Sequence, residues 1–257
     1  GHLLLVAGSL GKTGAAALGA ASAMRSGSGL VTVATPASQQ PIVAAHVLEA
    51  MTEPLPETPA HTLALKAREV IAELAAPRDA VAIGPGLGLE DETRQVVRSL
   101  IEKLDKPMAV DPDALTALVG HLELLRAAPR ARCLTPHPGE MARMLGVGVS
   151  DVQQDRPETA RAFPTRYRAH VVLKGAHSVI AAPDGRAFLN PTGNPGMASG
   201  GTGDVLTGML GAFLARGLDA EAALQSSVYL HGRAGDIAAE RVGEESLIAR
   251  GVIAAIP

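Results

Sequence analysis

NPTGNPGMASGGTGDVLTG, residues 190–208, is the stretch from which the rest of this chain is best interpreted. Glycine at this density costs backbone entropy, which is tolerated where a loop must come very close to another group. An apolar helical pattern begins directly after Asp204. The first N–H groups of a helix lack partners, and the helix dipole is positive at that end. The stretch therefore predicts a helix start that binds an anion, with phosphate as the natural ligand.

Asp204 has two interpretations from the residues alone. Its position is that of a helix cap, so its carboxylate could satisfy one or two of the first N–H groups. If a phosphate takes those N–H groups instead, the carboxylate is left to face a substrate as a base or an orienting group. The glycines ahead of Asp204 favour the second interpretation.

The same stretch resembles, nearly letter for letter, the signature of the ADP/ATP-dependent NAD(P)H-hydrate dehydratases, a branch of the ribokinase-like superfamily. Its Gly-x-Gly-Asp is shared with ribokinase-like kinases in general, and the preceding NPTGNPGMA narrows the resemblance. The resemblance implies that Asp204 is the catalytic base and also contacts the substrate.

Two further glycine-rich turns resemble the same family. GKTGAAALGAASAMRSGSGLVTVATP begins at residue 11 and GPGLG at residue 84, and each follows an apolar run that predicts a strand, at residues 2–8 and 79–83. A turn after a strand is where open α/β sheets bind ligands. From the residues alone, close helix packing or a tight bend would also explain these glycines. The resemblance implies a substrate pocket lined by Gly14, Ala15, Gly86 and Gly88.

The segment LTPHPGEMARMLG, residues 134–146, resembles a second family signature. His137 lies between two prolines, which exclude it from the interior of a regular element and favour a surface turn. By the resemblance, His137 contacts the hydrate. Asp111-Pro112-Asp113 resembles the family's Asp-Ala-Asp, with a proline that a helix start accepts. Asp111 is expected to orient the substrate or a metal-bound water, and Asp113 to cap the helix.

A third match lies at the end of a predicted strand, residues 169–175, where KGAHS resembles the family's nucleotide-binding KGxxS/T. A lysine at such a position is either a solvated tip or a phosphate partner, and the resemblance favours the phosphate partner. In the last predicted helix, residues 220–241, His231 is expected to be a core or cap residue. The resemblance implies nucleotide binding by Lys174, Gly175, Ala176, His177, Ser178, Gly201, Thr202 and Gly203.

Composition restricts the class of protein. A net charge of −3 and a pI near 6.3 provide no basic surface for nucleic acid. The single cysteine, Cys133, cannot form an internal disulfide, so a cytoplasmic location is the default. No run approaches the ~18 apolar residues that span a bilayer. The chain begins with Gly1 rather than methionine, so a trimmed or partial sequence is expected, with room for an epimerase domain upstream.

The predicted fold is α/β and ribokinase-like, with a mostly parallel central sheet and helices on both faces, in one domain of residues 1–257. Apolar residues make up 47% of the chain and aromatic residues only 2%, which is typical of helices packed on a parallel sheet. The hairpin expected around Pro183-Asp184-Gly185 adds antiparallel strands at one edge. A strand at 45–51, a proline-rich loop at 54–59 and a helix at 61–75 are also predicted. Pro164 is expected to kink or break its helix.

The resemblance implies ADP-dependent dehydration of the S epimers of NADHX and NADPHX, with Mg²⁺ and ADP or ATP. The metal ligands are not assigned, and a homo-oligomer, a tetramer by analogy, is expected. A ribokinase-like kinase of hydroxyethylthiazole or hydroxymethylpyrimidine is the alternative, although it would need neither His137 nor the NPGMA lead. An NAD(P)H oxidoreductase would need a dinucleotide fingerprint that the sequence lacks. A nucleotide sensor without turnover would keep only the phosphate loop.

Overall fold

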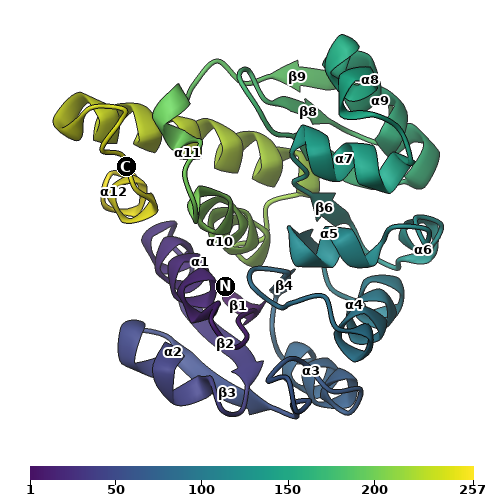
Figure 1. The fold of residues 1–257 in the computed structure, drawn as a ribbon, viewed down its shortest axis with the longest axis vertical. Helices are drawn as coiled ribbons and strands as arrows, with labels where there is room; N and C mark the ends of the chain where they lie inside the picture. Colours follow the sequence, from purple (N-terminus) through teal and green to yellow (C-terminus); the bar gives the residue numbers. More distant parts are fainter.

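One nine-stranded sheet, in the order β3-β2-β1-β4-β5-β6-β7-β8-β9, runs through the computed structural model, which describes residues 1–257 (Figure 1). Neighbouring strands from β3 to β7 are parallel, and β8 and β9 add an antiparallel hairpin at one edge. The predicted parallel sheet and edge hairpin are therefore confirmed. The strands are β1 (His2–Val6), β2 (Leu30–Pro36), β3 (Met51–Leu55), β4 (Ala80–Ile83), β5 (Met108–Val110), β6 (Arg132–Leu134), β7 (His170–Leu173), β8 (Val179–Ala181) and β9 (Ala187–Leu189).

Helices cover both faces of the sheet, as predicted (Figure 1). One face packs on α3 (Ala67–Ala75), α4 (Asp91–Lys103), α5 (Asp113–Ala117), α6 (Leu124–Ala127), α7 (Pro138–Leu145), α8 (Val149–Gln154) and α9 (Arg156–Tyr167). The other face packs on α1 (Thr13–Arg25), α2 (Gln40–His46), α10 (Thr202–Ala215) and α11 (Ala220–Val242). A smaller apolar cluster joins α10 and α11 to α12 (Ala249–Ala254), and the 3₁₀ turn η1 (Pro195–Met197) lies just before α10.

Alternation along each strand divides the core in two. Leu4 and Val6 of β1 face the layer of α3 to α9, whereas Leu3 and Leu5 face α1 and α10. The second layer is filled by small residues, including Ala16 and others along α1, so its helices approach closely. Cys133 is fully buried there as a free thiol, and burial raises its pKa to about 12.

The predicted strand at 45–51 is wrong. Residues 40–46 form α2, and the strand, β3, begins only at Met51. The predicted loop at 54–59 is wrong at its start, because Pro54 pairs with Thr35 inside β3. A proline cannot donate a hydrogen bond to the sheet, but β3 is an edge strand, where that loss is tolerated.

Two helix predictions also need correction. The helix expected at 61–75 begins only at Ala67, because Thr58 and Thr62 hydrogen-bond to each other across a turn and draw that segment out of a helix. Pro164 does not break α9, which continues to Tyr167. The proline is buried beside Phe163, and this packing offsets the hydrogen bond that a proline inside a helix loses.

The carboxyl ends of the parallel strands bring the sequence motifs to one edge of the sheet. Because β1, β4, β5, β6 and β7 are consecutive neighbours, the segments that follow them lie side by side. Hydrogen bonds continue this ladder past the strand ends, for example from Asp111 N to Ile83 O at 3.0 Å and from Lys174 N to Pro136 O at 2.8 Å. None of the helices combines the length and the apolar character that crossing a bilayer demands.

Candidate functional site

The start of α10 is an open helix end. Gly201 is the N-cap residue in a left-handed conformation with φ of 90°, which glycine adopts without strain. The backbone N–H groups of Gly203 and Asp204 make no hydrogen bond. Asp204 is the third residue of the helix, and its carboxylate caps none of these groups. The capping interpretation of Asp204 is therefore wrong, and the helix end is free to accept an anion.

Residues 190–200 form a platform on α11 that fixes the approach to this helix. Asp236 of α11 accepts hydrogen bonds from Gly193 N at 3.1 Å and from Asn194 Nδ2 at 3.0 Å. The Thr202 hydroxyl donates to Met197 O at 2.8 Å. A Cβ added at Gly232 of α11 would overlap the loop, so the glycines and amides of this signature serve to hold the loop shape.

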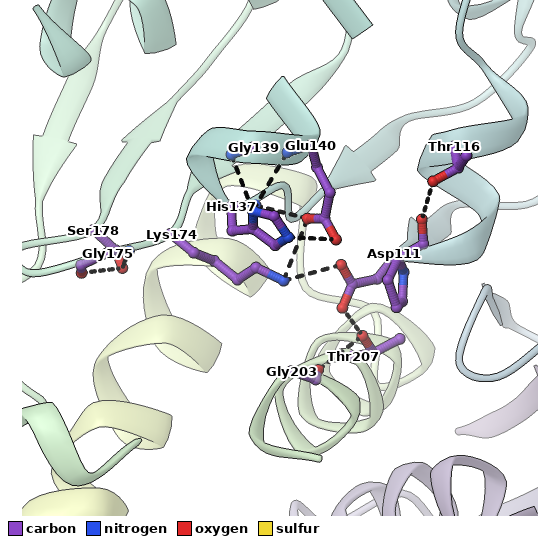
Figure 2. A network of polar contacts seen from close by, with 11 residues as sticks. Asp111, Thr116, His137, Gly139, Glu140, Lys174, Gly175, Ser178, Gly203 and Thr207 are labelled. Carbon is purple, nitrogen blue, oxygen red and sulfur yellow. Dashed lines mark hydrogen bonds and ion pairs between the residues drawn. The ribbon is translucent and has the colours of Figure 1, made fainter. Parts of the chain in front are cut away.

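A chain of charged side chains leads from α10 to α7 (Figure 2). Asp111, fully buried after β5, accepts from the Thr207 hydroxyl of α10 at 2.7 Å and pairs with Lys174 Nζ at 3.3 Å. Lys174 Nζ also lies 3.9 Å from Glu140 Oε2. A Cβ built on Gly203 would be 3.5 Å from Lys174 Nζ, so the lysine sits directly beside the open helix end.

His137 is the N-cap residue of α7. Its Nδ1 accepts from Gly139 N at 3.0 Å and Glu140 N at 3.3 Å, which leaves the ring proton on Nε2, 3.2 Å from Glu140 Oε1. The backbone N–H of His137 in turn donates to Glu140 Oε2 at 2.7 Å, which completes a capping box. The ring remains about half exposed, at 51%, so capping does not prevent it from contacting a ligand.

Burial and like charge shape the acidity of the site. Burial first, and the negative charge of Asp111 second, raise the pKa of Asp204 from 3.8 to about 6, against the opposing effect of Lys174. Burial also raises the pKa of Glu140, although Lys174 counteracts it. Asp204 is therefore a half-buried carboxylate, without a hydrogen-bond partner, whose pKa is close to neutral pH. Such a group is suited to accept a proton.

The two turns assigned to the substrate pocket pack against each other. A Cβ on Gly86 would lie 3.1 Å from the Cβ of Ala15, and the Ser9 hydroxyl donates to Gly86 O at 2.7 Å. Gly88 N donates to Asp113 Oδ2 at 2.8 Å, and the same oxygen pairs with Lys12 Nζ at 3.1 Å.

Asp113 was expected to cap a helix, and that prediction is wrong. It is the first residue of α5, its carboxylate caps no N–H group there, and it instead ties the two glycine turns together.

The first half of α10 packs against the second turn of α1. A Cβ on Gly201 would overlap Leu18 of α1, and one on Gly208 would overlap the carbonyl oxygen of Gly19. Such contacts allow the two helix axes to come close. The predicted substrate residues Gly14 and Ala15, at the start of α1, therefore lie on the same side of the sheet as the open end of α10.

The nucleotide turn, defined as residues 174–178, is held by hydrogen bonds within the turn and by Arg156 of α9. The Ser178 hydroxyl donates to Gly175 O at 3.1 Å, and Gly175 N approaches the same hydroxyl at 3.3 Å. Ala176 and His177 are exposed, and their N–H groups make no hydrogen bond. Of this turn, only Lys174 contacts the charged chain beside α10. Nucleotide binding by Gly175, Ala176, His177 and Ser178 stays a prediction. The same holds for Gly201, Thr202 and Gly203.

Sequence reasoning missed three residues of this region. Glu140 stands three residues after His137, and that spacing is the signature of a capping box. Thr207 looks like an ordinary residue within an apolar helix, and nothing in the sequence links it to Asp111. Arg156 lies in the segment that the sequence leaves least interpretable, yet it donates to Ala176 O of the nucleotide turn at 2.7 Å.

His231, in α11, is a residue whose Nε2 is buried without a hydrogen-bond partner. Burial, the largest effect, lowers its pKa to about 4. It is therefore neutral at physiological pH. The residue as a whole is only partly buried, so its expected role as a core or cap residue stays a prediction.

Comparison with known proteins identifies relatives along the whole chain. The family model described as NAD(P)H-hydrate dehydratase matches residues 3–257. A bifunctional NAD(P)H-hydrate repair enzyme from Moorella thermoacetica is 44% identical over 257 residues, covering 100% of this chain and 48% of that protein. The ADP-dependent (S)-NAD(P)H-hydrate dehydratase of Bacillus subtilis is 36% identical over 252 residues, covering 97% of this chain and 85% of that protein. The chain thus spans about half the length of the bifunctional relatives it matches.

Solved structures give the same result. A crystal structure of the ADP/ATP-dependent NAD(P)H-hydrate dehydratase from Bacillus subtilis, co-crystallised with ATP/Mg²⁺, has a TM-score of 0.84 at 34% identity, and covers 100% of this chain and 87% of that one. A hydroxyethylthiazole kinase from Pyrococcus horikoshii has a TM-score of 0.63 at 17% identity. At that identity the second match supports the ribokinase-like fold alone.

Proposed function

Because this chain belongs to the NAD(P)H-hydrate dehydratase family, we propose that it catalyses the ADP-dependent dehydration of the S epimers of NADHX and NADPHX, as a hydro-lyase. The observation that carries the proposal is the open start of α10. The first turn of this helix carries two unpaired N–H groups and the carboxylate of Asp204, whose pKa is raised. The ammonium of Lys174 lies beside Gly203 in the same turn. Transfer of a phosphoryl group requires those three functions together.

The chemistry begins with a ring hydroxyl, whose oxygen leaves poorly as hydroxide. Asp204 accepts the proton of this hydroxyl while the hydroxyl oxygen forms a bond to the β-phosphorus of ADP. The bond from that phosphorus to the oxygen of the α-phosphate breaks, and AMP departs. The N–H groups of Gly203 and Asp204 and the ammonium of Lys174 stabilise the charge of the transferring group. The ring carbon–oxygen bond then breaks with inorganic phosphate as the leaving group, a neighbouring ring carbon loses a proton, and the reduced nicotinamide is restored.

The residues around Lys174 fit a nucleotide that carries Mg²⁺. Asp111 and Glu140 are both carboxylates within 4 Å of Lys174 Nζ, and no group of three metal-binding side chains exists in the chain. Mg²⁺ is commonly held by one or two carboxylates, with waters and nucleotide phosphates completing its shell. Asp111 and Glu140 are the carboxylates that would hold such an ion beside the nucleotide, in exchange for part of their pairing with Lys174. When bound, the ion would neutralise charge on the phosphates.

One assay tests the proposal. Purified protein is mixed with NADHX and ADP, or ATP, and the absorbance of reduced nicotinamide is followed. We expect it to reappear with ADP and to stay absent without nucleotide. In the same assay, the rate at limiting hydrate should rise as the pH is raised through about 6, because Asp204 must be ionised to accept a proton. Turnover of hydroxyethylthiazole or hydroxymethylpyrimidine with ATP, and none of NADHX, would support the vitamin-kinase alternative instead.

Two further parts of the proposal concern context. We propose a cytoplasmic location, which is supported by the presence of a single cysteine, Cys133, that is free and fully buried. Assembly into a homo-oligomer is inferred from the family resemblance alone. Light scattering of the purified protein, with a mass above the 26.2 kDa of one chain expected, tests it.

A further inference from the structure

We propose that Arg156, the first residue of α9, is a positioning residue that shapes the nucleotide turn and supplies positive charge to the nucleotide phosphates bound there. The inference rests on the proposed nucleotide-dependent function. Arg156 is 18 residues upstream of Lys174, outside every motif of the sequence analysis, so it adds a residue to the site rather than restating one.

The contacts of Arg156 are directed at the backbone of this turn. Its Nη1 donates to Ala176 O at 2.7 Å, and its Nη2 donates to Leu173 O at 3.3 Å. The planar guanidinium thus spans the turn from the end of β7 to its tip. Two donors in one rigid plane fix the relative positions of the two carbonyls that they bind. The single ammonium of a lysine cannot do this.

Gly175 leaves the space that the guanidinium occupies. A Cβ on Gly175 would lie 2.7 Å from Nη2 and 3.0 Å from Cζ of Arg156. The φ of Gly175 is +145°, a value that other residues rarely adopt. The positive φ is what favours glycine at this position, and the absence of a Cβ there lets the guanidinium lie close against the turn.

These contacts separate the carbonyl groups of the turn from its N–H groups. The carbonyls of Leu173 and Ala176 face Arg156, while the N–H groups of Ala176 and His177 remain unpaired at the exposed surface. A short run of free N–H groups, with residues in left-handed conformations such as His177 with φ of 53°, forms a concavity that binds anions.

The charge of Arg156 has no counterpart within the chain. Its hydrogen bonds go to two backbone carbonyls rather than to a carboxylate, and its Nε is buried without a hydrogen-bond partner. Burial alone lowers its pKa, with no nearby carboxylate to oppose the shift. Arg156 also lies at the positive end of the α9 dipole, where a cation is unfavourable. Because Arg156 is only partly buried and has no acidic partner, its charge is available to a polyphosphate that approaches the turn.

The test measures nucleotide binding directly, by calorimetry with AMP and with ADP, beside the kinetics of hydrate dehydration. We expect Arg156→Ala to weaken AMP and ADP binding by about tenfold or more, because it removes both hydrogen bonds that fix the turn and a positive charge beside it. The value of kcat at saturating ADP should change by less than about threefold, since Arg156 does not touch the reacting atoms. Arg161→Ala is the matched control, because Arg161 lies on the same helix, is exposed and pairs only with Glu158.

Two more variants separate shape from charge. Arg156→Lys keeps the charge and loses the paired donors, whereas Arg156→Gln keeps one donor and loses the charge. If shape and charge both contribute, each variant weakens AMP binding less than Arg156→Ala does, and the affinity of Arg156→Gln depends less on salt than that of the wild type. Should Arg156→Ala fail to fold, the Arg156→Lys variant carries the test.

The outcomes distinguish this inference from the proposed function. If the wild type binds and uses ADP while all folded Arg156 variants bind AMP with unchanged affinity, Arg156 has only a structural role and the inference is overturned. If the wild type itself binds neither AMP nor ADP, the proposed function fails first. A loss of kcat without a change in AMP affinity would also contradict a positioning role at the nucleotide turn.

Discussion

Replacing Asp204 with asparagine should stabilise the folded protein above pH 6 while it abolishes turnover. The carboxylate is half-buried, makes no hydrogen bond and faces the negative charge of Asp111, so its ionised form is disfavoured in the folded state. An amide of the same size carries no charge and avoids this penalty. It also cannot accept the proton of a substrate hydroxyl, so the base is lost.

The magnitude follows from the pKa. The rise from 3.8 to about 6 in the folded state corresponds to roughly 3 kcal/mol, because one pKa unit is equivalent to 1.36 kcal/mol. The folded protein holds the Asp204 proton more tightly than the unfolded chain. The stability associated with this proton is therefore fully present below pH 3.8 and is lost as the pH rises through about 6. The variant and the wild type should differ little near pH 4 and by up to ~3 kcal/mol near pH 8.

Urea unfolding at a series of pH values measures this difference. Glu49→Gln serves as the control, because Glu49 is exposed and forms no ion pair, and its effect should be small and independent of pH. A constant difference between wild type and Asp204→Asn across the whole pH range would refute the reasoning. So would a variant that is less stable than the wild type near pH 8, since the carboxylate would then be a stabilising group.

Two further substitutions probe the packing and the substrate side. Gly208→Ala should lower the free energy of unfolding by about 1–3 kcal/mol, because its Cβ would overlap the carbonyl oxygen of Gly19 in α1. The control in urea unfolding is Gly200→Ala, because a Cβ added at Gly200 has no atom within 4 Å. Equal stability of the two variants would contradict the predicted overlap at Gly208. Asp113→Ala should raise the KM for the hydrate about fivefold with a smaller change in kcat, because it releases Gly88 N and the loop it holds. An unchanged KM in the dehydration assay would show that Asp113 does not order the pocket.

Much of this arrangement is visible in the sequence because parallel sheets follow simple rules. Each apolar run that ends in glycine or in a carboxylate predicts a strand whose carboxyl end lies at the ligand-binding edge. That reasoning places Gly86, Asp111 and Lys174 at one edge without any knowledge of side-chain contacts. The wrong strand at 45–51 has an equally simple cause, since a short apolar run does not distinguish a helix from a strand by periodicity.

The rest depends on contacts between residues far apart in sequence. Thr207 and Asp111 are separated by 96 positions, and the hydrogen bond between them exists only because α10 packs across the end of β5. Likewise, the sequence shows Asp113 at the start of a helix and predicts a cap, whereas the nearby Gly88 N–H and Lys12 offer it better partners. Local rules fix the position of such a carboxylate, and the tertiary fold decides which donors it meets.

The unusual composition of the core has the same origin as the site. For α10 to pack against the second turn of α1 around Gly19, the two helix axes must come closer than large side chains allow. Gly19 and Gly208 provide that approach where the helices touch, and Ala16 and Ala20 extend it along α1. Large side chains at these contact positions would push the two helices apart and shift Asp204 relative to the predicted substrate residues. Phe213 of α10 packs elsewhere in the same layer, so the requirement for small residues is confined to the contact between the two helices. Replacing these glycines to improve helix propensity should therefore cost both stability and activity.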